Sequence, residues 1–266
     1  MQISSGYLKK NLAVIALFIF LFGAGISAQE VEPAGSGDES FGSYLTKTLP
    51  KNLLLGSKNS VTGWNLAILG AGGGAAVILS QTDADWDIQD SLNNSLGKFG
   101  TIGDIGGNAL TLAGINAAAL IIGGTTHNEK LFETAKALLE ANILTSITTG
   151  ALKLSVGRER PDGSGTRFTS SFPSGHTSGS FALASTFDTM YGHKVGIPLY
   201  AFAGFVGWSR ISDNKHFLSD VIFGAALGTV IGRGAARIHK NKEKKRFAVM
   251  PYSDGYSSGV RVSLTW

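Results

Sequence analysis

The chain has 266 residues, 43% of them hydrophobic and 16% charged, which is enough apolar material for a large core and excludes an intrinsically disordered chain. It contains no cysteine, so disulfides, thiolate metal ligands and cysteine nucleophiles are excluded. The formal net charge is only +4, and no basic face with interleaved aromatic residues is present, so we expect no nucleic-acid partner.

The N-terminal segment has the pattern of a secretion signal. Lys9 and Lys10 precede an apolar run from Leu12 to Phe22, and small residues follow up to Ala28. The run is shorter than the ~20 residues that a membrane span needs. We therefore expect residues 1–28 to be a signal peptide cleaved after Ala28, and the protein to be exported to a periplasmic or other extracytoplasmic compartment.

The middle of the chain is expected to be helical. Residues 29–60 are polar and contain Gly and Ser, which predicts an irregular N-terminal arm or linker. Beyond it, apolar stretches with many small residues recur around 61–81, 105–126, 131–156, 177–191, 195–208 and 217–237. Their lengths favour helices, so the predicted fold class is all-α, with one helical-bundle domain over residues 61–246.

In the last twenty residues the hydrophobic pattern changes from helical spacing to alternation. Val260, Val262 and Leu264 alternate with polar residues, and Asp254-Gly255 supplies a turn upstream. This pattern predicts a short C-terminal β-hairpin over residues 247–266.

The charge-free runs test whether the helices cross a membrane. Two of them, 59–82 and 105–128, have 24 residues, but the other four have only 11 to 15. Six spans after an exported N-terminus would also place the basic C-terminal run outside the cytoplasm, against the positive-inside tendency. We therefore expect a globular extracytoplasmic bundle that is at most membrane-associated.

That basic run extends from Arg233 to Arg246 and contains seven Lys and Arg side chains against Glu243 alone. A solvated helix end would explain it, because cations complement the negative end of the helix dipole. Contact with an anionic membrane surface is the alternative, and the solvated helix end is the interpretation we favour. Both interpretations stay open.

Three short stretches carry polar residues with a recognisable chemistry. They read K-x6-R-P from Lys153 to Pro161, P-S-G-H from Pro173 to His176, and S-R-x5-H-x3-D from Ser209 to Asp220. Phosphoryl transfer places charge on three equatorial oxygens, and fixed cations stabilise that charge. The first and third stretches supply three such cations, Lys153, Arg160 and Arg210.

The remaining motif residues also suit phosphoryl transfer. Ser174 is expected to cap a helix whose first N–H groups, together with Gly175 and His176, bind an anion. His216 and Asp220 are four residues apart and are expected to share one helix face. The carboxylate can then hold one imidazole nitrogen and leave the other free as a nucleophile.

With these motifs the sequence resembles the type 2 phosphatidic acid phosphatase superfamily, which includes class A bacterial acid phosphatases, lipid phosphate phosphatases and vanadium haloperoxidases. The resemblance covers residues 153–220 and implies a helical bundle with its active site at helix ends. It implies a metal-independent phosphatase that needs no cofactor, is inhibited by vanadate, and hydrolyses a phosphomonoester or diphosphate, such as a lipid or isoprenoid phosphate.

The resemblance also assigns roles. His216 attacks phosphorus to give a phosphohistidine, Asp220 orients His216, and His176 protonates the leaving oxygen and then activates water. The phosphoryl group is bound by Lys153, Arg160, Ser174, Gly175 and Arg210.

Two alternatives remain from the sequence. A vanadium-dependent haloperoxidase would use the same residues to hold vanadate as its cofactor. A non-catalytic exported membrane-binding protein is disfavoured, because every motif position is intact.

Several other polar residues are interpreted as surface groups. His127, His193 and His239 lack the carboxylate spacing of a metal site. Glu133 and Glu140 share their segment with lysines, which is typical of a charged helix face.

Overall fold

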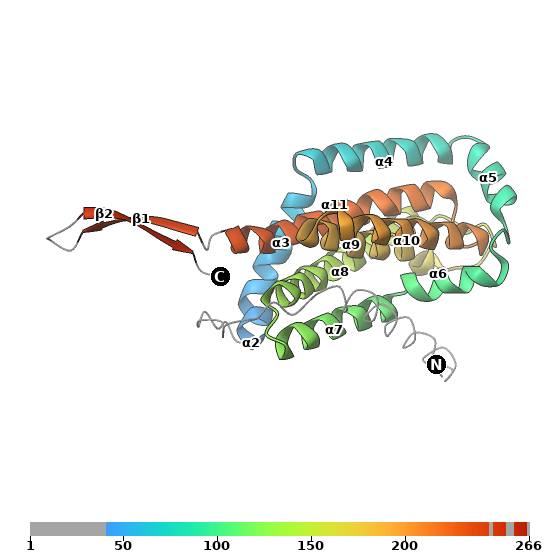
Figure 1. Ribbon diagram of the computed structural model, residues 1–266. Helices are drawn as coiled ribbons and strands as arrows, with labels where there is room; N and C mark the ends of the chain where they lie inside the picture. Colours follow the sequence, from blue (N-terminus) through green and yellow to red (C-terminus); the bar gives the residue numbers. More distant parts are fainter. Residues whose placement is uncertain (1–40, 245–246, 254–257, 265–266) are drawn as a thin grey trace.

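The computed structural model describes residues 41–244, 247–253 and 258–264 (Figure 1). Long helices dominate these parts, and shorter helical segments and one strand pair complete them. In chain order the elements are α2 (Phe41–Ser43), a π-helical turn (Tyr44–Thr48), α3 (Leu49–Ser60), α4 (Trp64–Ser80), α5 (Ala84–Leu92), a 3₁₀ turn (Gly97–Phe99), α6 (Gly100–Gly107), α7 (Ala109–Thr125), α8 (Glu129–Val156), a second 3₁₀ turn (Arg167–Thr169), α9 (Gly175–Tyr191), α10 (His193–Ser212), α11 (Leu218–Lys244), β1 (Phe247–Ser253) and β2 (Ser258–Leu264).

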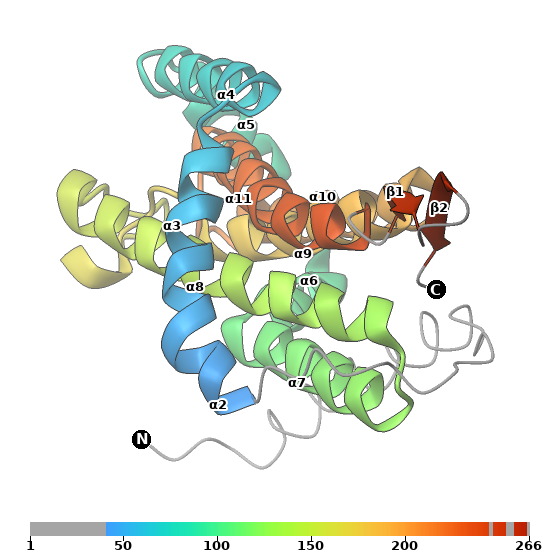
Figure 2. The same ribbon diagram turned by 90° about the vertical axis from the view of Figure 1, so that its left-hand side faces the viewer.

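Helix α9 lies in the middle of the bundle and packs against α8, α10 and α11. Figure 2 shows α4 on one side of this centre, against α11, and α7 on the other side, against α8. The core next to α9 is built from Leu183 and Phe187 of that helix, Leu138 of α8, Leu199 of α10 and Ile115 of α7. An all-α bundle is therefore confirmed.

Glycine allows α9 and α11 to cross closely. A Cβ at Gly228 of α11 would lie 2.1 Å from the Ser178 carbonyl oxygen and 2.9 Å from the Ala182 nitrogen, both backbone atoms of α9. Only a residue without a side chain fits such an approach. The close crossing also joins the starts of the two helices, because Ser174 N donates to the Asp220 carbonyl oxygen at 3.1 Å.

The six apolar stretches all form helices, namely α4 and α7 to α11. The expectation of an irregular arm over 29–60 is wrong for residues 41–60, which are helical and pack against α8 and α11. The buried residues of α3 are Asn52, Gly56 and Ser60, so this helix is held by polar and close backbone contacts that an apolar pattern does not reveal. The expected signal peptide and residues 29–40 lie outside the described residues.

The structure also corrects the expectation that His239 and Glu140 are surface groups. His239 is completely buried, with its Nδ1 2.6 Å from Glu133 Oε2 and its Nε2 2.9 Å from Glu140 Oε2. The other oxygen of Glu140 accepts from Tyr44 Oη at 2.9 Å and from Asn52 Nδ2 at 2.8 Å. His239 and Glu140 are therefore interior groups, because together they satisfy each other's polar atoms. His127 and His193 are exposed, as expected.

The C-terminal strands β1 and β2 pair in antiparallel register, with Phe247 opposite Leu264. They lie beyond the end of α11, away from the helical body (Figure 1). The expected turn at Asp254-Gly255 and the terminal Trp266 lie outside the described residues.

Helix α11 contains a stretch, Leu218–Lys240, that is long and apolar enough to cross a membrane. Two bent pairs, Tyr44–Ser60 with Trp64–Ser80 and Gly97–Gly107 with Ala109–Thr125, would raise the number of candidate spans in the described residues to three. By length and composition, this part of the chain therefore holds between one and three candidates, fewer than the six apolar stretches.

The basic run is only partly described. Arg233, Arg237 and Lys240 are half-buried, and Lys240 Nζ donates to the Thr189 carbonyl oxygen at 2.6 Å. These three side chains thus pack on the bundle. The side chains of residues 241–246 lie outside the described part, so contact with an anionic membrane stays a prediction.

Candidate active site

The first motif begins in the last turn of α8. This helix ends at Val156, and Gly157 takes a left-handed conformation with φ of 64°, which turns the chain out of the helix. Lys153 Nζ donates to the carbonyl oxygen of Ser170, and Ser170 Oγ donates to the Lys153 carbonyl oxygen at 2.9 Å. Burial and the nearby charge of Arg160 lower the pKa of Lys153 to about 8. Lys153 therefore still carries its charge at neutral pH.

Arg160 lies on the loop after α8. Its Nε donates to the Thr169 carbonyl oxygen at 2.9 Å. Burial, followed by repulsion from Arg210, lowers the pKa of Arg160. Arg160 therefore lies within electrostatic reach of both Lys153 and Arg210, and it connects the three predicted cations.

The second motif starts α9. Ser174 occupies the N-cap position, as expected, but its side chain makes no capping hydrogen bond to the described backbone. The Ser174 hydroxyl is fully buried and accepts from Thr177 Oγ1 at 2.9 Å. Gly175 and His176 are half-exposed in the first turn, where helical N–H groups have no intrahelical acceptor. The donors that this turn could offer to an anion are therefore backbone N–H groups beside His176.

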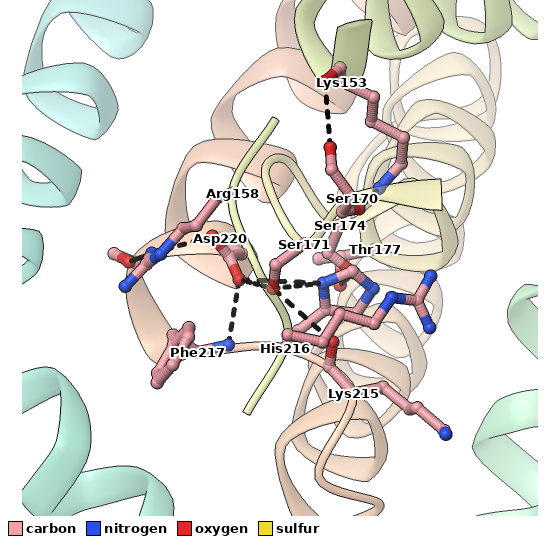
Figure 3. Close-up of polar contacts among 12 residues, drawn as sticks. Lys153, Arg158, Ser170, Ser171, Ser174, Thr177, Lys215, His216, Phe217 and Asp220 are labelled. Carbon is pink, nitrogen blue, oxygen red and sulfur yellow. Dashed lines mark hydrogen bonds and ion pairs between the residues drawn. The ribbon is translucent and has the colours of Figure 1, made fainter. Parts of the chain in front are cut away.

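The third motif lies across the start of α11. His216 precedes this helix, and Asp220 lies in its first turn, so the two residues do not share a helix face as predicted. Instead, Asp220 Oδ2 accepts from Phe217 N at 2.9 Å, as in an N-terminal capping box, and this bond folds the chain back. The predicted pair forms nonetheless, with His216 Nδ1 3.7 Å from Asp220 Oδ2 (Figure 3).

Asp220 is held from several sides. Figure 3 shows its carboxylate between Arg158 on one side and Ser171 and His216 on the other. Arg158 Nη1 donates to Asp220 Oδ1 at 2.9 Å, and Ser171 Oγ donates to Oδ2. Burial alone would raise the pKa of Asp220, but the His216 contact and the Arg158 charge hold it below its usual range. The carboxylate therefore stays ionised behind the imidazole.

His216 is only 3% exposed, and its environment keeps it neutral. Burial lowers the pKa of His216 to about 4, against the opposing effect of Asp220, and the charges of Lys153 and Arg160 lower it further. Because Nδ1 faces Asp220, Nε2 is the nitrogen that points away from that carboxylate. A neutral imidazole beside fixed cations is chemically competent to attack an electrophilic phosphorus.

Arg210 and His176 meet at another carboxylate, Asp104, which the sequence analysis missed. Asp104 Oδ1 accepts from Arg210 Nη1 at 2.6 Å and lies 3.3 Å from His176 Nε2. Its helix, α6, approaches closely through glycine, since a Cβ at Gly107 would lie 3.0 Å from His176 Cβ. The His176 contact, opposed by burial and reinforced by Arg210, lowers the pKa of Asp104.

Three further residues of this network were also missed, namely Arg158, Ser171 and Asp85. Arg158 lies inside the first motif, but its spacing alone gives it no role distinct from Arg160. Ser171 lies just ahead of the P-S-G-H stretch. Asp85 belongs to α5, a helix that the sequence did not predict.

A hollow of about 380 Å³ opens beside these residues, with Arg160, Pro161, Trp86 and Phe217 in its walls. It offers aromatic surface next to one of the predicted phosphate-binding cations. Within the described part of the chain, no group of three or more His, Asp or Glu side chains could hold a metal ion.

A helical bundle that gathers cations around a buried neutral histidine, at the start of a helix, has the features of an oxyanion-binding centre. Residues 134–244 match the model of the PAP2 superfamily. This stretch, less than half of the chain, thus matches the family that the motifs resemble, and the resemblance is confirmed.

Relatives with known names extend this comparison. The lipid A 1-phosphatase of Porphyromonas gingivalis is 45% identical over 83 residues, which cover 30% of this chain and 18% of that protein. The chain thus matches less than a fifth of the length of this curated relative.

Two solved structures are similar. Aquifex aeolicus LpxE is 24% identical, with a TM-score of 0.48 over 57% of this chain and 94% of that one. The transmembrane PAP2-type phosphatidylglycerolphosphate phosphatase from Bacillus subtilis is 22% identical, with a TM-score of 0.41 over 76% of this chain and 97% of that one.

Proposed function

We propose that this protein is a phosphatase that hydrolyses a phosphomonoester or diphosphate carried by a lipid, through a phosphohistidine intermediate. The observation that carries the proposal is the state of His216. It is buried, neutral and backed by an ionised carboxylate, and it lies within the field of Lys153 and Arg160. This combination provides a nucleophile and charge stabilisation at one point.

The reaction has two steps. In the first, Nε2 of His216 forms a bond to phosphorus while the bond from phosphorus to the leaving oxygen breaks, and His176 gives that oxygen a proton. In the second, water attacks phosphorus, His176 takes the proton, and the phosphorus–nitrogen bond breaks to release phosphate and neutral His216. The imidazolium that forms during the first step is stabilised by Asp220.

Cations hold the phosphoryl oxygens in both steps. Lys153, Arg160 and Arg210 surround the site, and the first N–H groups of α9 at Gly175 add backbone donors. The Ser174 hydroxyl accepts its bond from Thr177, which does not use its own hydrogen, so it can still donate to a phosphoryl oxygen. No metal ion or cofactor enters this scheme.

Two observations support a lipid as the carrier. The first is the similarity to a lipid A 1-phosphatase, which is 45% identical over 83 residues. In addition, large apolar side chains are exposed on α3, α4 and α7, including Leu54, Trp64, Ile78 and Ile121. Exposed apolar surface of this kind is typical of proteins that contact a membrane. We place the protein at an extracytoplasmic membrane surface, as the N-terminal signal pattern predicts.

A substrate panel tests the proposal. Purified protein is incubated with phosphatidic acid, an isoprenoid diphosphate, lipid A and a soluble alkyl phosphate, with and without detergent and always in EDTA, and released phosphate is measured. We expect turnover of at least one lipid phosphate in EDTA and its inhibition by vanadate, with none in His216→Ala.

Three outcomes would contradict parts of this account. Turnover that EDTA abolishes and a divalent ion restores would overturn metal independence. Turnover of the soluble ester alone would overturn the lipid substrate. Peroxide-dependent bromination after vanadate loading, without phosphate release from any substrate, would assign the site to a haloperoxidase instead.

A further inference from the structure

The structure contains a buried ion-pair chain behind the proposed nucleophile. Asp85, in the first turn of α5, is 1% exposed, and none of the three motifs includes it. Its Oδ2 accepts from Arg158 Nη2 at 2.9 Å and from Ser219 Oγ, and its Oδ1 accepts from Ser219 N at 2.9 Å. Asp85 therefore binds both the first motif and the start of α11.

Arg158 connects this aspartate to the site. While Nη2 binds Asp85, Nη1 donates to Asp220 Oδ1 at 2.9 Å and to Ser219 Oγ at 2.6 Å. One guanidinium thus bridges two buried carboxylates, and its rigid planar fork of donors fixes their relative position better than the rotating donors of an ammonium group would. Figure 3 shows Arg158 on the side of Asp220 away from His216.

Aromatic rings fix the plane of the guanidinium. The Cζ atom of Arg158 lies 4.1 Å from the ring centroid of Phe217. The ring of Trp86, the neighbour of Asp85 on α5, packs edge-on against Phe217 with centroids 4.7 Å apart. Arg158 is therefore oriented by stacking as well as by its ion pairs.

We infer that Asp85 is a positioning residue for the reaction, which acts on the nucleophile through Arg158 and Asp220. The inference rests on the proposed function, because it assigns a role relative to His216. Two physical effects produce the role. Asp85 holds Arg158 where it can fix Oδ1 of Asp220, and this leaves Oδ2 turned toward the imidazole.

The second effect is a balance of charge. Without Asp85, the charge of Arg158 would neutralise Asp220, and Asp220 could no longer stabilise the imidazolium that forms when His216 bonds to phosphorus. With Asp85 present, the three groups keep one net negative charge. The hydrogen bonds of Asp85 go to Arg158 and Ser219 and to none of the predicted phosphate-binding cations, so its effect should fall on turnover and spare substrate binding.

The test compares Asp85→Asn with wild type, using p-nitrophenyl phosphate as the probe. Asparagine has nearly the same shape and can still accept from Ser219 N, but it carries no charge. We expect kcat to fall about 10- to 100-fold, the usual effect of losing a hydrogen bond between charged groups, with KM changed less than about threefold. Asp87→Asn is the matched control, because Asp87 is exposed in the same helical turn, and it should leave both constants unchanged.

A double-mutant cycle separates positioning from a merely structural role. If Asp85 acts through Arg158, Asp85→Asn combined with Arg158→Lys should lose no more turnover than Arg158→Lys alone. Additive losses, or a rise in KM with unchanged kcat, would overturn the inference. Circular dichroism establishes whether each variant is folded. If Asp85→Asn does not fold, Arg158→Lys serves as the test instead. A normal kcat for folded Arg158→Lys would then overturn the inference.

The result for wild type distinguishes failure of the proposed function from failure of the inference about Asp85. Absence of wild-type turnover on p-nitrophenyl phosphate and on the lipid panel would overturn the proposed function and, with it, the inference. Wild-type turnover together with an unchanged kcat in Asp85→Asn would overturn the inference alone.

Discussion

Asp104 Oδ1 and Arg210 Nη1 form a 2.6 Å ion pair inside the site. In the proposed reaction Arg210 is one of the cations that bind the phosphoryl group. A carboxylate in that position competes with a bound anion for the guanidinium and repels its charge. Asp104→Asn should therefore tighten inhibition by inorganic phosphate about five- to tenfold, corresponding to roughly 1 kcal/mol. Competitive inhibition constants measure this effect.

Asp213 Oδ2 lies 3.2 Å from the same Arg210 Nη1, so Asp213→Asn should also tighten phosphate inhibition, but less than Asp104→Asn because the contact is longer. Weaker phosphate inhibition in Asp104→Asn than in wild type would show that the carboxylate supports anion binding rather than opposing it.

The lowered pKa of Lys153, about 8, predicts how substrate binding depends on pH. Lys153 is charged below this value and becomes neutral as the pH rises through it, so the phosphoryl group loses one cation. KM should accordingly rise above pH 8. Lys153→Arg keeps the charge at all accessible pH values and should move the rise upward. Superimposable KM profiles for the two proteins would exclude Lys153 as the titrating group.

His176 is assigned as the general acid, and general acids matter most when the leaving group is poor. His176→Ala should lose about 10²–10⁴-fold in turnover of an alkyl phosphate. It should lose far less on p-nitrophenyl phosphate, whose leaving group needs no proton. Steady-state rates on the two esters give the comparison, and equal losses on both would assign His176 to phosphate binding.

The buried cluster around His239 predicts a large effect on stability. Burial opposes charge on His239, but the two glutamates outweigh it and raise the pKa of His239 in the folded protein. This pairing therefore stabilises the fold fully at pH values below the unfolded pKa, and the contribution is lost as the pH rises through the higher folded value. His239→Ala would leave Glu133 and Glu140 without their shared partner and should lower the free energy of unfolding by about 3–5 kcal/mol.

Urea denaturation of His239→Ala at pH 6 and pH 9 measures that loss, which should be smaller at the higher pH. His193→Ala is the control, because its side chain is 84% exposed and pairs only with Asp188 at a surface. It should change stability by less than about 0.5 kcal/mol. A His239→Ala variant as stable as His193→Ala would contradict the role of the cluster.

The sequence predicts those helices that bury apolar side chains and misses those that do not. The six long helices follow from their apolar stretches. By contrast, α5 buries Asp85 and Gln89, and most of the buried residues of α6 are glycines. Neither pattern has an apolar period, so neither helix could be read from the chain.

The same reason limits what the sequence reveals of the site. All eight predicted site residues come from the three sequence motifs, because the short spacings within a motif reflect local chain geometry. Asp85 and Asp104 reach the site from α5 and α6, through contacts between residues far apart in the chain. His239 likewise meets Glu133 and Glu140 across about a hundred residues. Such pairings depend on tertiary packing, which spacing does not encode.

The measurement that tests the central claim most directly is trapping of the covalent intermediate. Wild type, His176→Ala and His216→Ala are mixed with labelled p-nitrophenyl phosphate, quenched in alkali to preserve an acid-labile phosphorus–nitrogen bond, and mapped by mass spectrometry. We predict label on His216 in wild type, more label on the same residue in His176→Ala, and none in His216→Ala. Label on His176, or an unchanged amount of label in His216→Ala, would contradict the assignment of His216 as the nucleophile.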